Sequence, residues 1–255
     1  MKSIRERALN GELLTGTWCN LGSSLTVEIA GLAGFDWLTI DMEHGSGGYE
    51  SLVHQLQAAD ATPVAPIVRV AWNEAPRFKR VLDLGPSGIL VPYVSTAEEA
   101  AQAARSMRYP PDGIRGVAKL NRACAFGQEF DEYLATANDR LLTVVQIETQ
   151  QALDNVREIA AVDGVDVLFV GPLDLTVSLG IAQQFDHPRF HAAMEAVAQA
   201  ARNAGKAAGT LMLAPSMIGW TIPLGYSFVA LGSDGGMVAR GMREAAATLA
   251  RYKGT

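Results

Sequence analysis

The sequence is poor in the residues that mark several protein classes. Only two of its 255 residues are cysteines, Cys19 and Cys124, too few for a disulfide framework. No apolar run approaches the about 18 uninterrupted residues of a membrane-spanning helix, and the charged N-terminus lacks a signal-peptide core. No basic run accompanies the net charge of −6. These absences predict a cytoplasmic protein with neither a membrane nor a nucleic acid as partner.

The usual phosphate-binding glycine patterns are also missing. After the first apolar run the chain reads CNLGSS at 19–24, which does not match G-x-G-x-x-G. Gly205-Lys206 is followed by Ala207, and no glycine stands five residues before Gly205, so it is not a Walker sequence. A doubly wound nucleotide-binding sheet is therefore disfavoured.

Apolar residues, in contrast, are plentiful and strongly patterned. They make up 49% of the chain, against 19% charged residues, which is enough for a large core. Eight short runs read as continuously apolar, as strands buried on both faces should. The predicted strands are Leu14–Trp18, Trp37–Ile40, Ala65–Val70, Ile89–Val91, Leu142–Ile147, Val165–Val170, Ala208–Met212 and Phe228–Leu231.

Helix patterns follow most of these runs, so the chain alternates between strand and helix. The predicted helices are Ser24–Leu32, Tyr49–Ala59, Asn73–Leu84, Thr96–Met107, Thr149–Ala161, His187–Ala204 and Met237–Tyr252. Eight such units fit a closed (β/α)₈ barrel, an α/β fold, formed as a single domain over residues 1–255. One long irregular stretch, Tyr109–Gly127, interrupts the alternation and is expected to be a functional loop.

Polar residues gather where the predicted strands end. In such barrels the active site is built at the carboxyl ends of the strands. The residues found there are Asp41, Glu43 and His44, then Arg69, then Gln146 and Glu148, then Asp174, and finally Ser233 and Asp234. This clustering predicts a site at that end of the barrel.

Glu148 and Asp174 are a candidate metal pair. Two carboxylates at the ends of sequential strands would repel each other in a narrow site, and a hard divalent cation removes that repulsion. Gln146 lies two residues before Glu148, on the same face of the strand, and could orient a substrate carboxylate. The alternative is that both acids merely begin helices, where negative charge is favoured.

His44, Arg69 and Asp83 are candidate catalytic residues. His44 precedes a glycine-rich segment and could act as a general base; the alternative is a loop histidine bonded to a carbonyl. Arg69 could stabilise a substrate carboxylate or enolate, or form a structural ion pair with Asp41 or Glu43. Asp83 ends a helix, where its charge opposes the dipole, so a partner such as a histidine could hold it; it could also simply be exposed.

Several ordered motifs together resemble the HpcH/HpaI aldolases. They are the Asp41–His44 segment after FDWLTI, Arg69 followed by Trp72-Asn73, Leu90–Pro92, Tyr109–Gly116, Gln146–Thr149 and Gly171–Leu175. The resemblance runs from about Gly16 to Ala250. That family comprises metal-dependent class II pyruvate aldolases, including 4-hydroxy-2-oxoheptanedioate and 2-dehydro-3-deoxyglucarate aldolases.

The resemblance implies a barrel that assembles as a homohexamer, a trimer of dimers with an exchanged C-terminal helix. It implies that Glu148 and Asp174 bind Mg²⁺, Mn²⁺ or Co²⁺, and that His44 is the base, made more basic by Asp83. Arg69 would stabilise the transition state. Gln146, Arg69, Asp174 and the backbone around Leu173 would bind the 2-oxo acid. Residues 117–120 would face the aldehyde half of the site.

The implied reaction cleaves 4-hydroxy-2-oxo acids into pyruvate and an aldehyde. The predicted strand ends carry no lysine, which argues against a Schiff-base mechanism. Two alternatives stay open: a malyl- or citramalyl-CoA-type thioester lyase, and a non-catalytic carboxylate-binding barrel. The aldehyde and the physiological metal are not specified by the residues.

Overall fold

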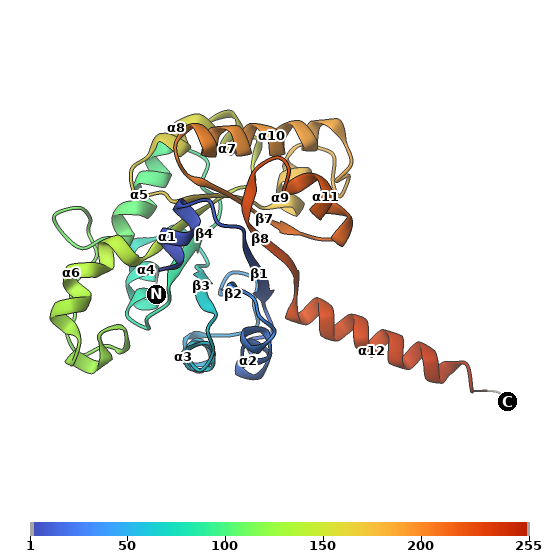
Figure 1. Ribbon diagram of the computed structural model, residues 1–255, viewed down its shortest axis with the longest axis horizontal. Helices are drawn as coiled ribbons and strands as arrows, with labels where there is room; N and C mark the ends of the chain where they lie inside the picture. Colours follow the sequence, from blue (N-terminus) through green and yellow to red (C-terminus); the bar gives the residue numbers. More distant parts are fainter. Residues whose placement is uncertain (1–2, 254–255) are drawn as a thin grey trace.

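The computed structural model describes residues 3–253, and its centre is a closed barrel of parallel strands (Figure 1). Each strand pairs with the next along the chain, and the last pairs with the first, which confirms the predicted (β/α)₈ fold. The strands are β1 (Leu14–Cys19), β2 (Trp37–Asp41), β3 (Ala65–Arg69), β4 (Gly88–Val91), β5 (Leu142–Ile147), β6 (Val167–Val170), β7 (Ala207–Met212) and β8 (Tyr226–Ser233).

Aromatic side chains fill the barrel interior. Trp37 stacks on Phe228 with ring centroids 4.1 Å apart, and Trp18 meets Phe169 at 5.6 Å. Gly16 makes room for this layer, because a Cβ there would lie 2.4 Å from the Trp37 ring. The interior is therefore a packed core, and a ligand has to bind outside this aromatic layer.

The helices surround the barrel, with small differences from the predicted bounds. The charged N-terminal start, which also reads as helical, forms α1. The predicted helix Thr149–Ala161 is divided at Asn155, and three helices, α6, α9 and α11, were not predicted. α6 buries only Ala137, so it lacks an apolar face, and the other two span two turns or less. The helices are α1 (Ile4–Leu9), α2 (Ser24–Leu32), α3 (Tyr49–Asp60), α4 (Ala75–Leu82), α5 (Ala97–Met107), α6 (Phe130–Arg140), α7 (Gln150–Asp154), α8 (Val156–Ala161), α9 (Pro172–Ser178), α10 (Pro188–Asn203), α11 (Ile218–Thr221) and α12 (Asp234–Ala250).

The last helix, α12, projects away from the barrel instead of packing on it (Figure 1). Its start is fixed, because the buried Asp234 accepts hydrogen bonds from the Asn20 backbone at 2.8 Å and the Thr26 hydroxyl at 2.7 Å. Beyond that start the helix is almost entirely exposed, including Met242 and Leu249. Within residues 3–253, no helix is long and apolar enough to cross a membrane.

The long stretch Tyr109–Gly127 lies at the opposite end of the barrel from the predicted site. It follows α5 and leads through α6 into β5, so it connects helix to strand at the amino ends of the strands. The expectation that residues 117–120 face the aldehyde half of the site is therefore wrong for this chain's own barrel. The alternation pattern located the loop but did not indicate at which end of the barrel it lies.

Candidate active site

A cavity of about 500 Å³ opens at the carboxyl ends of the strands. Its size falls within the range of small-molecule sites, about 300–1,000 Å³. Most of the predicted site residues lie on its wall. They are His44, Arg69, Gln146, Leu173 and Asp174.

Arg69 connects the acids at one side of the cavity. Its Nε and Nη2 donate to the two carboxylate oxygens of Asp41 at 3.0 and 2.7 Å. Nη1 lies 2.9 Å from a carboxylate oxygen of Glu43, without hydrogen-bond geometry, and donates to Gln146 Oε1 at 3.4 Å. The ion pair that the sequence left as an alternative is thus present, while the guanidinium still faces the cavity and retains N–H groups for a ligand.

Asp41 also shapes the loop that carries His44. Its Oδ1 accepts the backbone N–H groups of Glu43 at 3.0 Å and His44 at 3.2 Å. Burial raises the pKa of Asp41, but the hydrogen bonds and charge of Arg69 outweigh it and lower the pKa below its usual value. One buried carboxylate therefore fixes both the arginine and the histidine loop.

His44 extends into the open mouth of the cavity, with 71% of its side chain exposed. The carboxylate of Glu43 lies beside its ring, with Oε1 3.8 Å from Nε2. Burial raises the pKa of Glu43, and the charges of Arg69 and His44 partly oppose that shift. His44 is accessible to a substrate hydroxyl, as a general base must be.

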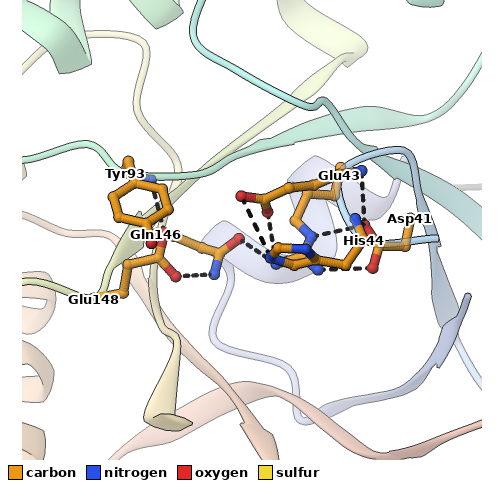
Figure 2. A network of polar contacts seen from close by, with 7 residues as sticks. Asp41, Glu43, His44, Tyr93, Gln146 and Glu148 are labelled. Atoms are coloured by element: carbon orange, nitrogen blue, oxygen red, sulfur yellow. Dashed lines mark hydrogen bonds and ion pairs between the residues drawn. The ribbon is translucent and has the colours of Figure 1, made fainter. Parts of the chain in front are cut away.

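Glu148 is buried at the other end of the same polar network (Figure 2). Its Oε1 accepts the Tyr93 backbone N–H at 2.7 Å, and its Oε2 accepts from Gln146 Nε2 at 2.5 Å. Burial raises the pKa of Glu148 to about 7. The hydrogen bond from the Tyr93 N–H opposes this rise, and the negative charge of Asp174 adds to it. Gln146 thus links the Glu148 end of the network to Arg69.

The residues around Glu148 fit a divalent cation. A Cβ at Gly171 would lie 2.5 Å from Glu148 Oε2, so this glycine leaves open the space beside the carboxylate. Asp174, in the first turn of α9, faces the same cavity. Among residues 3–253 no cluster of three or more histidine, cysteine or acidic side chains forms a complete metal cage. Two carboxylates with open positions match an ion completed by water and substrate oxygens.

Asp83 does not lie near His44 within the chain. It follows α4, which runs from the end of β3 toward the amino ends of the strands, away from the cavity. There Asp83 accepts from Arg115 Nη2 at 3.2 Å, and Arg115 is buried between Tyr109 and Tyr133. The prediction that Asp83 needs a partner is met by an arginine, not by His44 of the same chain.

Sequence reasoning missed Tyr93. It follows β4 with a φ of 54°, a conformation rare for a residue with a side chain, and this turns its N–H toward Glu148. Its ring lies 5.7 Å from that of Trp72. The only sequence signal was its place just after an apolar strand, because backbone conformation cannot be read from the residue type.

Comparisons with known proteins show which family this chain resembles. A family model described as HpcH/HpaI aldolase/citrate lyase matches residues 14–241. A 4-hydroxy-2-oxo-heptane-1,7-dioate aldolase of Klebsiella pneumoniae is 43% identical over 91% of this chain and 88% of its own length. A family protein of known structure from Burkholderia cenocepacia superposes with a TM-score of 0.92 at 38% identity, covering 98% of this chain and 99% of that one.

A second solved structure, an HpcH/HpaI aldolase from Desulfitobacterium hafniense, is 28% identical, with a TM-score of 0.90. It covers 98% of this chain and 97% of its own. The match thus includes the whole barrel and every strand end described above. The chain belongs to the HpcH/HpaI aldolase/citrate lyase family.

Proposed function

We propose that this carbon–carbon lyase cleaves 4-hydroxy-2-oxo acids reversibly into pyruvate and a short aldehyde. The observation that carries the proposal is the polar network of one cavity, in which Gln146 joins the buried Glu148 to Arg69. Relatives about 40% identical are named 4-hydroxy-2-oxo-heptane-1,7-dioate aldolase. For that substrate the products are pyruvate and succinic semialdehyde.

We propose Glu148 and Asp174 as ligands of a divalent cation, Mg²⁺, Mn²⁺ or Co²⁺. When bound, such an ion acts as a Lewis acid that polarises the keto group. The supporting observations are the open space beside Gly171 and the influence of Asp174 on the pKa of Glu148. Exhaustive chelation should abolish pyruvate release and added Mn²⁺ should restore it; full activity with no metal by elemental analysis contradicts the assignment.

The chain's own residues then perform the proton and charge transfers. Gln146 and the backbone around Leu173 hold the substrate carboxylate. His44 takes the proton of the C4 hydroxyl, the C3–C4 bond breaks, and the aldehyde leaves. The electron pair of that bond becomes the pyruvate enolate, and Arg69 stabilises its charge with N–H groups that Asp41 holds in place. Protonation at C3 completes the reaction. No lysine is found among the described residues that line the cavity.

The test is a panel of 4-hydroxy-2-oxo acids with pyruvate release followed by a coupled dehydrogenase. We expect metal-dependent turnover of the free acids, with His44→Ala lowering kcat by about 10²–10⁴-fold, as for loss of a general base. Turnover of malyl-CoA or citramalyl-CoA without turnover of any free acid would identify a thioester lyase instead. Binding of oxo acids without any cleavage would identify a carboxylate-binding barrel.

We further propose that residues 1–255 form one aldolase domain and that copies of it exchange α12 within a homohexamer. Two apolar surfaces of the chain support the exchange. Met242 and Leu249 of α12 are 69% and 68% exposed, and Leu25, Ile29 and Leu32 of α2 are 67–71% exposed. Exposed apolar residues that gather on one surface often mark an interface. Any action of Asp83 on His44 requires a second copy, because α4 directs it away from the cavity of its own chain.

A further inference from the structure

One cation on the cavity wall has no role in the reaction described above. Arg240 lines the cavity from the second turn of α12, next to Met237 and Gly236. Within residues 3–253 it forms no ion pair and no hydrogen bond, whereas Arg69 on the same wall is held by Asp41 and Glu43. Arg240 is an exposed residue of the cavity wall, so its guanidinium is accessible to a ligand in the cavity.

The first turn of α12, directly before Arg240, is fixed to the barrel. Asp234 is buried and accepts hydrogen bonds from Asn20 and Thr26, and Ser233 caps the helix through the Gly236 N–H. Although the far part of α12 projects from the barrel, this first part forms one wall of the cavity. The backbone that carries Arg240 thus begins at a defined place relative to the strand ends.

The cavity has room for more than pyruvate. Its volume of about 500 Å³ greatly exceeds that of pyruvate, and much of the remaining wall is apolar. That part consists of Leu211, Leu213, Pro215, Leu231 and Met237. An alkyl chain can lie against such a surface, and a charge beyond the chain would need a partner there.

We propose that Arg240 is a specificity-determining residue: it binds the distal carboxylate of a 4-hydroxy-2-oxo diacid and so makes this chain prefer an acidic aldehyde. This rests on the proposed aldolase function and adds to it the residue that would select the distal carboxylate. A guanidinium matches a carboxylate through two parallel hydrogen bonds, which a lysine cannot reproduce. In such a diacid the 2-oxo carboxylate would lie near Gln146, and the far carboxylate would lie on Arg240.

Binding of two unreactive analogues tests this without any turnover. 2-Oxoheptane-1,7-dioate and 2-oxoheptanoate both lack the 4-hydroxyl and differ only in the distal carboxylate. By calorimetry with Mn²⁺ present, we expect the wild type to bind the diacid at least about tenfold more tightly than the monoacid. Arg240→Gln should remove most of that preference, and Arg240→Lys should restore only part of it. Arg243→Gln, one turn further along α12 and off the cavity wall, should preserve it.

Aldol addition to pyruvate gives a second, independent readout. Succinic semialdehyde and butyraldehyde have the same chain length, and only the first is charged. Arg240→Gln should lower kcat/KM for succinic semialdehyde about 10- to 100-fold and leave that for butyraldehyde within twofold. A wild type that does not discriminate, or an Arg240→Gln variant that keeps the full discrimination, overturns the assignment. If the wild type did not exchange the methyl protons of pyruvate with solvent at all, the aldolase function itself would be contradicted.

Discussion

At the scale of single residues, the site depends on how the positive charge of the buried Arg69 is compensated. Arg69 and Asp41 are both nearly buried and joined by two hydrogen bonds, so removal of either leaves a charge without compensation. Asp41→Ala should therefore lower the free energy of unfolding by about 3–5 kcal/mol. Asp163→Ala is the matched control. Asp163 forms an ion pair with Arg108 at the same distance, 2.7 Å, but its side chain is 92% exposed.

The control should cost about 0–1 kcal/mol, as for an exposed pair. Urea unfolding of the two variants and the wild type measures the difference. Equal effects would show that Arg69 finds other partners, with Glu43 and Gln146 as the nearest groups.

Gly171 offers a second prediction at this scale. An added methyl group would lie 2.5 Å from Glu148 Oε2 and 2.9 Å from Gln146 Nε2, so Gly171→Ala should displace the proposed metal ligand. We expect Mn²⁺ affinity, measured by titration, to fall at least tenfold, since the ligand set is disturbed. Gly219→Ala in α11 meets nothing within 4 Å and should bind Mn²⁺ like the wild type. Unchanged affinity in Gly171→Ala would argue against metal at this position.

Residue type and position predicted much of the site. His44, Arg69, Gln146 and Asp174 all line the cavity, because residues after the strands of a parallel barrel meet at one end. Tyr93 could not be predicted, since its contribution comes from a φ of 54° and a backbone N–H rather than from its side chain.

At the scale of elements, the direction of α4 decides the environment of Asp83. Whether a second copy brings Asp83 to His44 can be tested with Asp83→Asn. If it does, kcat should fall and the acidic limb of the pH–rate profile should move to lower pH, because the base loses an acidic neighbour. Pyruvate binding should change little. An unchanged profile at the wild-type rate would leave Asp83 as a structural partner of Arg115 alone.

The first strands and α1 are joined by Asp36. Burial raises its pKa, but hydrogen bonds from Thr15 and Arg7 outweigh burial and lower it below its usual value. A lowered pKa means that the stabilisation is fully present above the unfolded-state pKa of about 4 and is lost as the pH falls through the folded-state pKa. Asp36→Asn should therefore cost about 1 kcal/mol at pH 7, and the difference from wild type should shrink below about pH 4. Urea unfolding across this pH range measures it, and a constant difference would contradict the account.

The barrel could be predicted from the sequence pattern, whereas the direction of α12 could not. The alternation of apolar strands with amphipathic helices predicted the closed barrel, because strands covered on both faces give continuous apolar runs. The same periodicity predicted α12 as a helix, yet it could not indicate that the helix leaves its own barrel. An apolar helix face specifies that a partner exists, not which chain supplies it.

At the scale of the whole molecule, exchange of α12 predicts that assembly depends on its apolar residues. Leu249→Glu places a charge on a face that is exposed in the single chain, so a monomer would tolerate it. In an exchanged assembly the same charge would be buried, and sedimentation should show smaller species at equal concentration. Val177→Glu in α9, also 58% exposed, should leave the sedimentation coefficient unchanged. Identical assembly in all three proteins would contradict the exchange.

The central claim is that the strand ends generate and stabilise the pyruvate enolate, with His44 acting only on the C4 hydroxyl. Exchange of pyruvate methyl protons with deuterated solvent, followed by NMR, tests it most directly, because this exchange needs the enolate but no C4 hydroxyl. We expect metal-dependent exchange in the wild type. Exchange should persist in His44→Ala, with solvent water as the base, and should be lost in Arg69→Ala, whose missing donor costs about 10²–10³-fold. Exchange at the wild-type rate in Arg69→Ala, or none in the metal-loaded wild type, would contradict the account.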